Sequence, residues 1–403
     1  MPAPSLPPEL LDHIIDLLHD SQTALRNCCL VSKSWIPRTR AHLFAEVEFV
    51  TKEELESWKE KFPDPSASPA RYTKTLTVRC EIVTAKDAEE GGWIRGFSYV
   101  ERLEVTADGD FGEMVSFLPF RGFSPILKSL RLDPHFHPLS QLFDLILSFP
   151  LLEDLNVAKL TDYNNNDVGS PRTSTVVQPP NQPMTGFLDL SRWYPWLGFI
   201  ANWLLSLPGG IHFCKLAVQC SKPQDILVAT KLVEECSHTL EYIEIDYDYD
   251  GTPIWYPLPH RQLIFGSASW ESDSLDLSKA NRLKHSVFRV ESDLVDWVTM
   301  ALRTIKPEHR DFRQITIDLP SISSLFRPIV GEVIFGQWLE LDRLLAQLWE
   351  SHSIRPKVLC YAPVGTENRV TERVGSLLPE VTGRGIIDWD FELRAVLEYI
   401  ETE

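Results

Sequence analysis

A short alternation of apolar and polar residues recurs along most of this 403-residue chain. Each copy is typical of a β-strand with one buried face, because successive side chains on a strand point to opposite sides. Five of the seven intervals between the copies are 25 or 27 residues long, and the other two are 61 and 45. A repeated interval of this length predicts an array of stacked structural units. The first buried positions of the eight predicted strands are Leu76, Leu103, Leu130, Leu155, Leu216, Ile243, Phe288 and Ile315.

Apolar stretches with helical spacing precede several of these strands, at residues 139–149, 196–207, 226–236 and 294–305. Proline ends two of them, because the residue before a proline disfavours the helical conformation. One strand and one helix per unit resemble the units of leucine-rich-repeat proteins, which bury their apolar faces only when they are stacked. The expected fold class is therefore α/β, with an irregular leucine-rich-repeat solenoid and a curved parallel sheet.

The two long intervals and the C-terminal region need separate explanations. Residues 161–186 are rich in Asn, Pro, Ser and Thr, a composition that predicts a disordered insertion. A second, better ordered insertion is expected between residues 250 and 281. Residues 337–349 predict an amphipathic helix, and the acidic stretch 388–403 predicts a helix that caps the end of the array.

The N-terminal segment, residues 6–44, has a different pattern that predicts three short helices. Ser21 and Ser32 are suitable N-caps for the second and third helices, and Pro37 is expected to interrupt the third. Three helices of this size bury little surface by themselves, so part of their apolar face is expected to remain available for a partner. The first helix carries a broad apolar face made of Leu10, Leu11, Ile14, Ile15, Leu17 and Leu18.

The order and spacing of residues in this segment resemble the F-box. Eukaryotic substrate receptors use this motif to bind the linker subunit of SCF-type cullin-RING ubiquitin ligases. Two departures are Pro37 in the third helix and Phe44, where a tryptophan often closes the motif. The resemblance implies an F-box module at residues 1–48 and a leucine-rich-repeat-like domain at 49–403. The matching positions are Leu6, Pro7, Glu9, Leu10, Ile14, Leu18, Leu25, Leu30, Val31, Ser32, Trp35, Leu43 and Phe44.

An F-box followed by such repeats implies a substrate adaptor that is not an enzyme and needs no cofactor. Its expected partners are the linker subunit, cullin bound through that linker, and an unidentified protein substrate. Three alternatives remain open: a helical N-terminal cap whose leucines all face inward, a leucine-rich scaffold unrelated to ubiquitin, and a metal-dependent or hydrolytic enzyme. Outward side chains of the strands would bind the substrate, and the candidates are Arg79, Arg102, Glu104, Arg131, Asn156, Tyr242 and Glu244.

Composition limits the functions of the chain further. Its 39 Lys and Arg against 57 Asp and Glu give a net charge of −18, which disfavours binding to nucleic acid or to anionic membranes. The N-terminus lacks the features of a signal peptide, and no apolar stretch has the roughly 20 residues that a bilayer requires. With seven scattered cysteines, these features predict a protein of the cytoplasm or nucleus.

No motif in the sequence predicts a metal site or a catalytic site. The Asp-x-Asp-x-Asp-Gly run at 246–251 begins like a calcium loop, but Pro257 occupies the position of the required glutamate. His135 and His137 could hold a metal only with ligands from elsewhere in the chain. Neither site is therefore assigned, and no residue is given a catalytic role.

Overall fold

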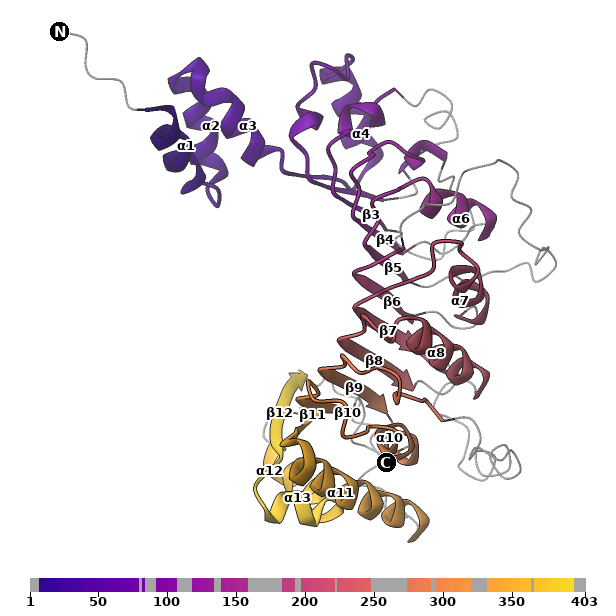
Figure 1. Cartoon of the computed structure of the whole chain (residues 1–403). Coiled ribbons are helices and arrows are strands. Elements are labelled where there is room, and N and C mark those ends of the chain that lie inside the picture. Colours follow the sequence, from indigo (N-terminus) through magenta and orange to yellow (C-terminus); the bar gives the residue numbers. More distant parts are fainter. Residues whose placement is uncertain are drawn as a thin grey trace, which may run out of the picture. The chain divides into compact units, whose positions relative to one another are not determined.

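A computed structural model of the chain describes residues 7–79, 82–83, 92–106, 118–133, 139–158, 183–192, 197–221, 223–247, 274–290, 295–319, 332–363 and 366–394. These residues form a mixed α/β fold with twelve strands and eleven α-helices (Figure 1). The chain divides into two compact units, Met1–Pro183 (unit 1) and Met184–Glu403 (unit 2). The predicted α/β class with a parallel sheet is confirmed.

Unit 1 begins with three helices and continues with parallel strands in chain order. The helices are α1 (Pro8–Asp16), α2 (Gln22–Val31) and α3 (Ile36–Leu43), with the 3-10 turn η1 (Lys33–Trp35) before α3. The strands are β1 (Glu46–Phe49), β2 (Thr75–Arg79), β3 (Arg102–Thr106), β4 (Ser129–Asp133) and β5 (Asp154–Ala158). Between them lie α4 (Lys52–Lys61), η2 (Pro69–Tyr72), η4 (Ile94–Phe97), η5 (Leu118–Phe120) and α6 (Leu139–Leu147).

Unit 2 also consists of parallel strands in chain order. They are β6 (Phe187–Arg192), β7 (Lys215–Gln219), β8 (Tyr242–Tyr247), β9 (His285–Val290), β10 (Gln314–Leu319), β11 (Arg355–Pro363) and β12 (Asp388–Arg394). The helices are α7 (Leu197–Leu205), α8 (Pro223–Glu235), α10 (Val295–Arg303), α11 (Glu332–His352), α12 (Glu367–Leu377) and α13 (Pro379–Gly383).

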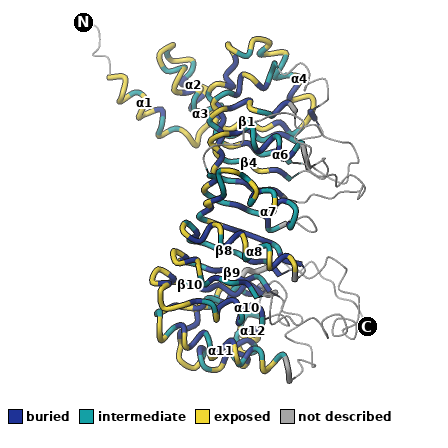
Figure 2. Tube along the Cα trace, turned by 45° about the vertical axis from the view of Figure 1, so that its right-hand side comes forward, coloured by how far each residue is buried: buried dark blue, intermediate teal, exposed yellow. Residues whose placement is uncertain are grey.

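Helices cover one face of the strands in each unit, and the core lies between the two layers (Figures 1 and 2). The helices bury apolar side chains such as Ile146 of α6, Ile200 of α7 and Trp338 of α11. The opposite face of the strands carries mostly polar side chains, as in β8, where buried and half-buried residues alternate. Among the described residues, no helix is both long enough and apolar enough to cross a bilayer.

Most predicted helices and strands are confirmed, but four strands were missed. Strand β6 lies within the 61-residue interval, and β1 and β11 lie at the margins of the predicted array. The prediction of a capping helix at 388–403 is wrong over its first seven residues, which form β12. The acidic composition suggested a solvated helix, whereas the alternation of Asp388, Asp390 and Glu392 with apolar residues matches the period of a strand.

Two predicted details of the loops and caps differ from the structure. Pro37 does not interrupt the third helix but lies in the first turn of α3, where a proline removes no helical hydrogen bond. Of the predicted insertion at 161–186, residues 161–182 lie outside the described residues. Its last residues are described, and Met184 pairs with Ile211 in a parallel bridge.

The pairing register aligns most of the predicted buried positions. In unit 1 it places Leu76, Leu103, Leu130 and Leu155 in one row. In unit 2 Leu216 and Ile243 are aligned, but the next residue in the row is Ser286 rather than Phe288. The predicted position in β9 is therefore two residues late, because a serine at a buried position gives no apolar signal in the sequence.

Replacing Ser286 with alanine is expected to increase the free energy of unfolding by about 1 kcal/mol, measured by urea titration. The side chain is fully buried, and its hydroxyl has no hydrogen-bond partner within the described part of the chain. Ser124 is a matched control, because its buried hydroxyl donates to Val100 O at 2.7 Å. Ser124→Ala should destabilise the chain, and equal losses in the two variants would contradict this account of Ser286.

Candidate docking surfaces

Helix α1 divides its apolar residues between two faces, and this split corrects the single broad face predicted from the sequence. Ile15 is fully buried, whereas Leu10, Ile14 and Leu17 are 50 %, 41 % and 69 % exposed. Leu10 and Ile14 belong to the helix, and Leu17 is its C-cap residue with helical backbone angles, so the spacing i, i+4 and i+7 places all three on the same side. They form an apolar stripe that is exposed to solvent, and Figure 2 shows that α1 is largely exposed.

Helix α2 also exposes apolar side chains at its C-terminal end. Leu25 and Cys28 are buried within the helical module, while Leu30 is 85 % and Val31 66 % exposed. Single exposed apolar residues are common on protein surfaces, but several on two short helices make these helices a candidate interaction surface. We call Leu10, Ile14, Leu17, Leu30 and Val31 the exposed apolar set.

The other predicted linker-binding residues have more varied environments. Pro7 and Glu9 are exposed, and Leu6 lies outside the described residues. Ser32 accepts a hydrogen bond from Ser34 N at 3.3 Å and caps the turn that leads into α3. The remaining members are half-buried, namely Leu18, Trp35, Leu43 and Phe44. Leu17 was not among the predicted residues, although its helical spacing from Leu10 and Ile14 could have identified it.

A group of polar side chains joins α1 to α3. The Arg38 guanidinium donates to both carboxylate oxygens of Asp16 at 2.6 Å, and His42 Nε2 lies 2.7 Å from Asp16 Oδ1. Hydrogen bonds from Arg38 and then from His42 hold the pKa of Asp16 well below its usual range. This group was not predicted from the sequence, because its members lie 22 and 26 residues apart and belong to no recognisable motif.

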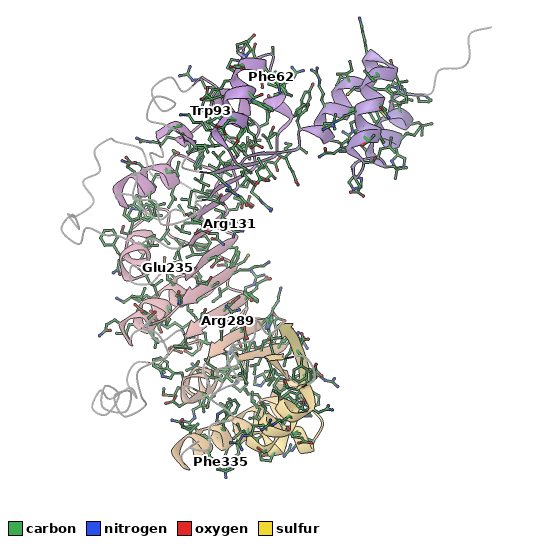
Figure 3. All side chains as sticks on the ribbon, turned by 180° about the vertical axis from the view of Figure 1, so that it is seen from behind. Phe62, Trp93, Arg131, Glu235, Arg289 and Phe335 are labelled. Carbon is green, nitrogen blue, oxygen red and sulfur yellow. The ribbon has the colours of Figure 1, made fainter. Side chains whose placement is uncertain are left out.

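In unit 1, the predicted substrate-binding residues lie at outward positions of β2 to β5. The register places Glu104, Arg131 and Asn156 in one row across three neighbouring strands. Arg131 and Arg102 are exposed, while Glu104, Asn156 and Arg79 are half-buried. These residues therefore present a surface of mixed charge, of which Arg131 is labelled in Figure 3.

In unit 2, the predicted residues Tyr242 and Glu244 belong to a network centred on Arg289. Arg289 donates to Asp318 at 2.8 Å and lies 3.5 Å from Asp246 and 4.0 Å from Glu244. The Tyr242 hydroxyl donates to Glu244 at 2.9 Å. Figure 3 shows Arg289 on the strands of this unit, whereas Glu235 lies among its helices.

The electrostatics of this network follow from burial and pairing. Burial lowers the pKa of Arg289, but the hydrogen bond that it donates to Asp318 and the negative charges of the nearby carboxylates raise this pKa above its ordinary value. Burial, followed by the negative charge of Glu244, raises the pKa of Tyr242. The Tyr242 side chain is therefore neutral and the Arg289 side chain charged across the physiological range of pH.

Most of the candidate metal-binding residues lie outside the described part of the chain. Asp248, Asp250, His135 and His137 lie outside the described residues. Asp246 is described, and it is paired with Arg289. In the part of the chain that the structure describes, no three His, Cys, Asp or Glu side chains are grouped so as to hold a metal ion.

Comparison of the chain with models of known protein families found no match, and comparison with curated proteins found none either. The resemblance of residues 6–44 to the F-box therefore rests on the residues themselves and on the helices that they form.

Proposed function

We propose that this protein is a substrate-recognition adaptor of an SCF-type cullin-RING ubiquitin ligase. In this proposal, α1 to α3 are an F-box that binds the linker subunit, and the strands with their helices are an irregular leucine-rich-repeat domain that binds a protein substrate. The adaptor acts by proximity: holding the substrate near a ubiquitin-charged enzyme raises its effective concentration. No residue of this chain needs to take part in bond chemistry.

The exposed apolar set is the observation that carries the proposal. If α1 to α3 served only as a cap of the repeats, their leucines would face inward, yet Leu10, Leu17 and Leu30 are at least half exposed. Full burial of an exposed side chain of this size is favourable by about 1.5–3 kcal/mol, and a docked partner would recover the share of this free energy that matches the exposed fraction of each residue. An F-box explains both the exposure and the positions of these residues.

The repeat assignment is supported by the regularity of the strands. Each strand pairs in parallel with its successor within its unit, and the buried leucines of β2 to β5 are aligned. Stacked units of this kind present a row of outward side chains on every strand, which suits the recognition of an extended protein surface. The mixed charge of Arg79, Arg102, Glu104, Arg131 and Asn156 fits a polar protein surface as substrate.

Hydrogen–deuterium exchange with recombinant linker subunit tests where docking occurs. Addition of the linker is expected to slow exchange in Pro8–Asp16 and Gln22–Val31, because a bound partner would exclude water from both helices. Helix α8 provides an internal control, since it also exposes a leucine, Leu227, but lies in unit 2. Binding without slower exchange in α1 and α2 would contradict the proposed site.

A further inference from the structure

We infer that Asp16, Arg38 and His42 form a clasp that positions α1 for linker docking. The inference rests on the proposed function, because it assigns these residues to the geometry of the exposed apolar set. They need not contact the linker themselves. Their role is to fix the stripe of Leu10, Ile14 and Leu17 relative to Leu30 and Val31 on α2.

Apolar burial alone holds α1 weakly. The helix has nine residues and only one of them, Ile15, is buried. No side chain caps its N-terminus, where Pro7 is the N-cap residue. Helices shorter than about 12 residues are marginal by themselves, so the orientation of α1 depends on the few contacts that it makes with its neighbours.

Helices α1 and α2 are linked through common neighbours. Helix α1 packs on α3 and on the turn η1, and α2 packs on the same two elements. A change in the way α1 rests on α3 would therefore move Leu10, Ile14 and Leu17 relative to Leu30 and Val31. The clasp is located at this contact, because Asp16 belongs to α1 and both of its partners belong to α3.

The charges of Asp16 and Arg38 are placed where they stabilise the contact between α1 and α3 but not the helix to which each belongs. Asp16 is the last residue of α1, where a negative charge opposes the helix dipole. Arg38 lies in the first turn of α3, where a positive charge is also unfavourable. Each charge is unfavourable in its own helix and favourable toward the other, which is expected of a pair that orients one helix on another.

Because the clasp is partly exposed to solvent, we expect it to orient α1 without contributing much to the stability of the whole fold. The side chains of Asp16 and Arg38 are 34 % and 43 % exposed, and ion pairs with this exposure contribute little to the free energy of unfolding. Their two parallel hydrogen bonds nevertheless restrict geometry, because a carboxylate and a guanidinium match in only a few orientations. Loss of the clasp should therefore weaken docking while the chain remains folded.

The test measures linker affinity for the full chain, Asp16→Asn, Arg38→Gln and the double variant. Each single variant is expected to bind the recombinant linker roughly tenfold more weakly, and the double variant no more weakly than either one, because both remove the same contact. The melting temperature should stay unchanged. The control is Glu234→Gln, which removes an exposed pair with Lys279, also at 2.6 Å, in unit 2 and should leave the affinity unchanged.

Hydrogen–deuterium exchange of the free chain separates this inference from the proposed function. In Asp16→Asn, exchange in Pro8–Asp16 should become faster while exchange in Gln22–Val31 stays the same. Unchanged exchange in α1, or additive losses of affinity in the double variant, would overturn the clasp. If the wild-type chain fails to bind the linker, the adaptor proposal fails, and the exchange of α1 still decides whether Asp16 orders this helix.

Discussion

A chain that carries Leu10→Asp and Ile14→Asp is expected to lose binding to the SCF linker subunit. Both side chains lie on the exposed stripe of α1, so docking would bury two carboxylates against an apolar surface. Burying a charge without a partner is so unfavourable that we expect affinity to fall at least about a hundredfold, or about 2.7 kcal/mol. Because Leu10 is 50 % and Ile14 41 % exposed in the free chain, the fold should be retained. Calorimetric titration measures the affinity.

Leu227→Asp provides the matched control for this variant. Leu227 is a helical residue with 43 % exposure, close to that of Ile14, but it belongs to α8 of unit 2. The same change of chemistry at this position should leave linker binding intact. Equal loss in the control would point to a nonspecific effect of added charge, and wild-type affinity in the double variant would contradict docking through α1.

Replacing Arg289 with methionine is expected to reduce the free energy of unfolding by about 3 kcal/mol. The Arg289 guanidinium lies within 4.0 Å of three carboxylates, and the Asp318 side chain is only 2 % exposed. A typical surface ion pair contributes less than about 1 kcal/mol, but here the substitution removes the cation that lies 2.8 Å from a nearly buried carboxylate. Urea unfolding followed by circular dichroism measures the change.

A second substitution tests the cause of this loss. Asp318→Asn in the Arg289→Met background removes the buried negative charge and should restore part of the lost stability. If the double variant is less stable than Arg289→Met, the loss does not arise from an uncompensated charge at Asp318. If Arg289→Met is as stable as the wild type, the network contributes nothing to the stability of the fold.

The period of the strands made the parallel architecture predictable, whereas breaks in that period led to the errors. Leu76, Leu103 and Leu130 are 27 residues apart and occupy equivalent positions in the sheet. The register of β9 was misplaced, because Ser286 occupies a buried position and Phe288 gave the first apolar signal. Strand β6 was missed because the long polar stretch before it lengthens the interval between β5 and β7, so that β6 does not follow β5 at the spacing of the other strands.

The candidate site was predictable where it depends on helical spacing and not where it depends on tertiary contacts. Spacing identified the apolar residues of α1, but it could not separate exposed Ile14 from buried Ile15, which are adjacent in sequence. The pairing of Asp16 with Arg38 depends on how α1 meets α3. The burial of Asp318 depends in the same way on its neighbours in the sheet. Neither arrangement leaves a pattern in the sequence.

Titration of the recombinant linker subunit into the wild-type 403-residue chain tests the central claim most directly. The proposal predicts saturable binding at one linker per chain, followed by recruitment of cullin to the complex. A folded wild-type chain that binds no linker would contradict the adaptor role and leave a leucine-rich scaffold unrelated to ubiquitin as the better explanation of the structure.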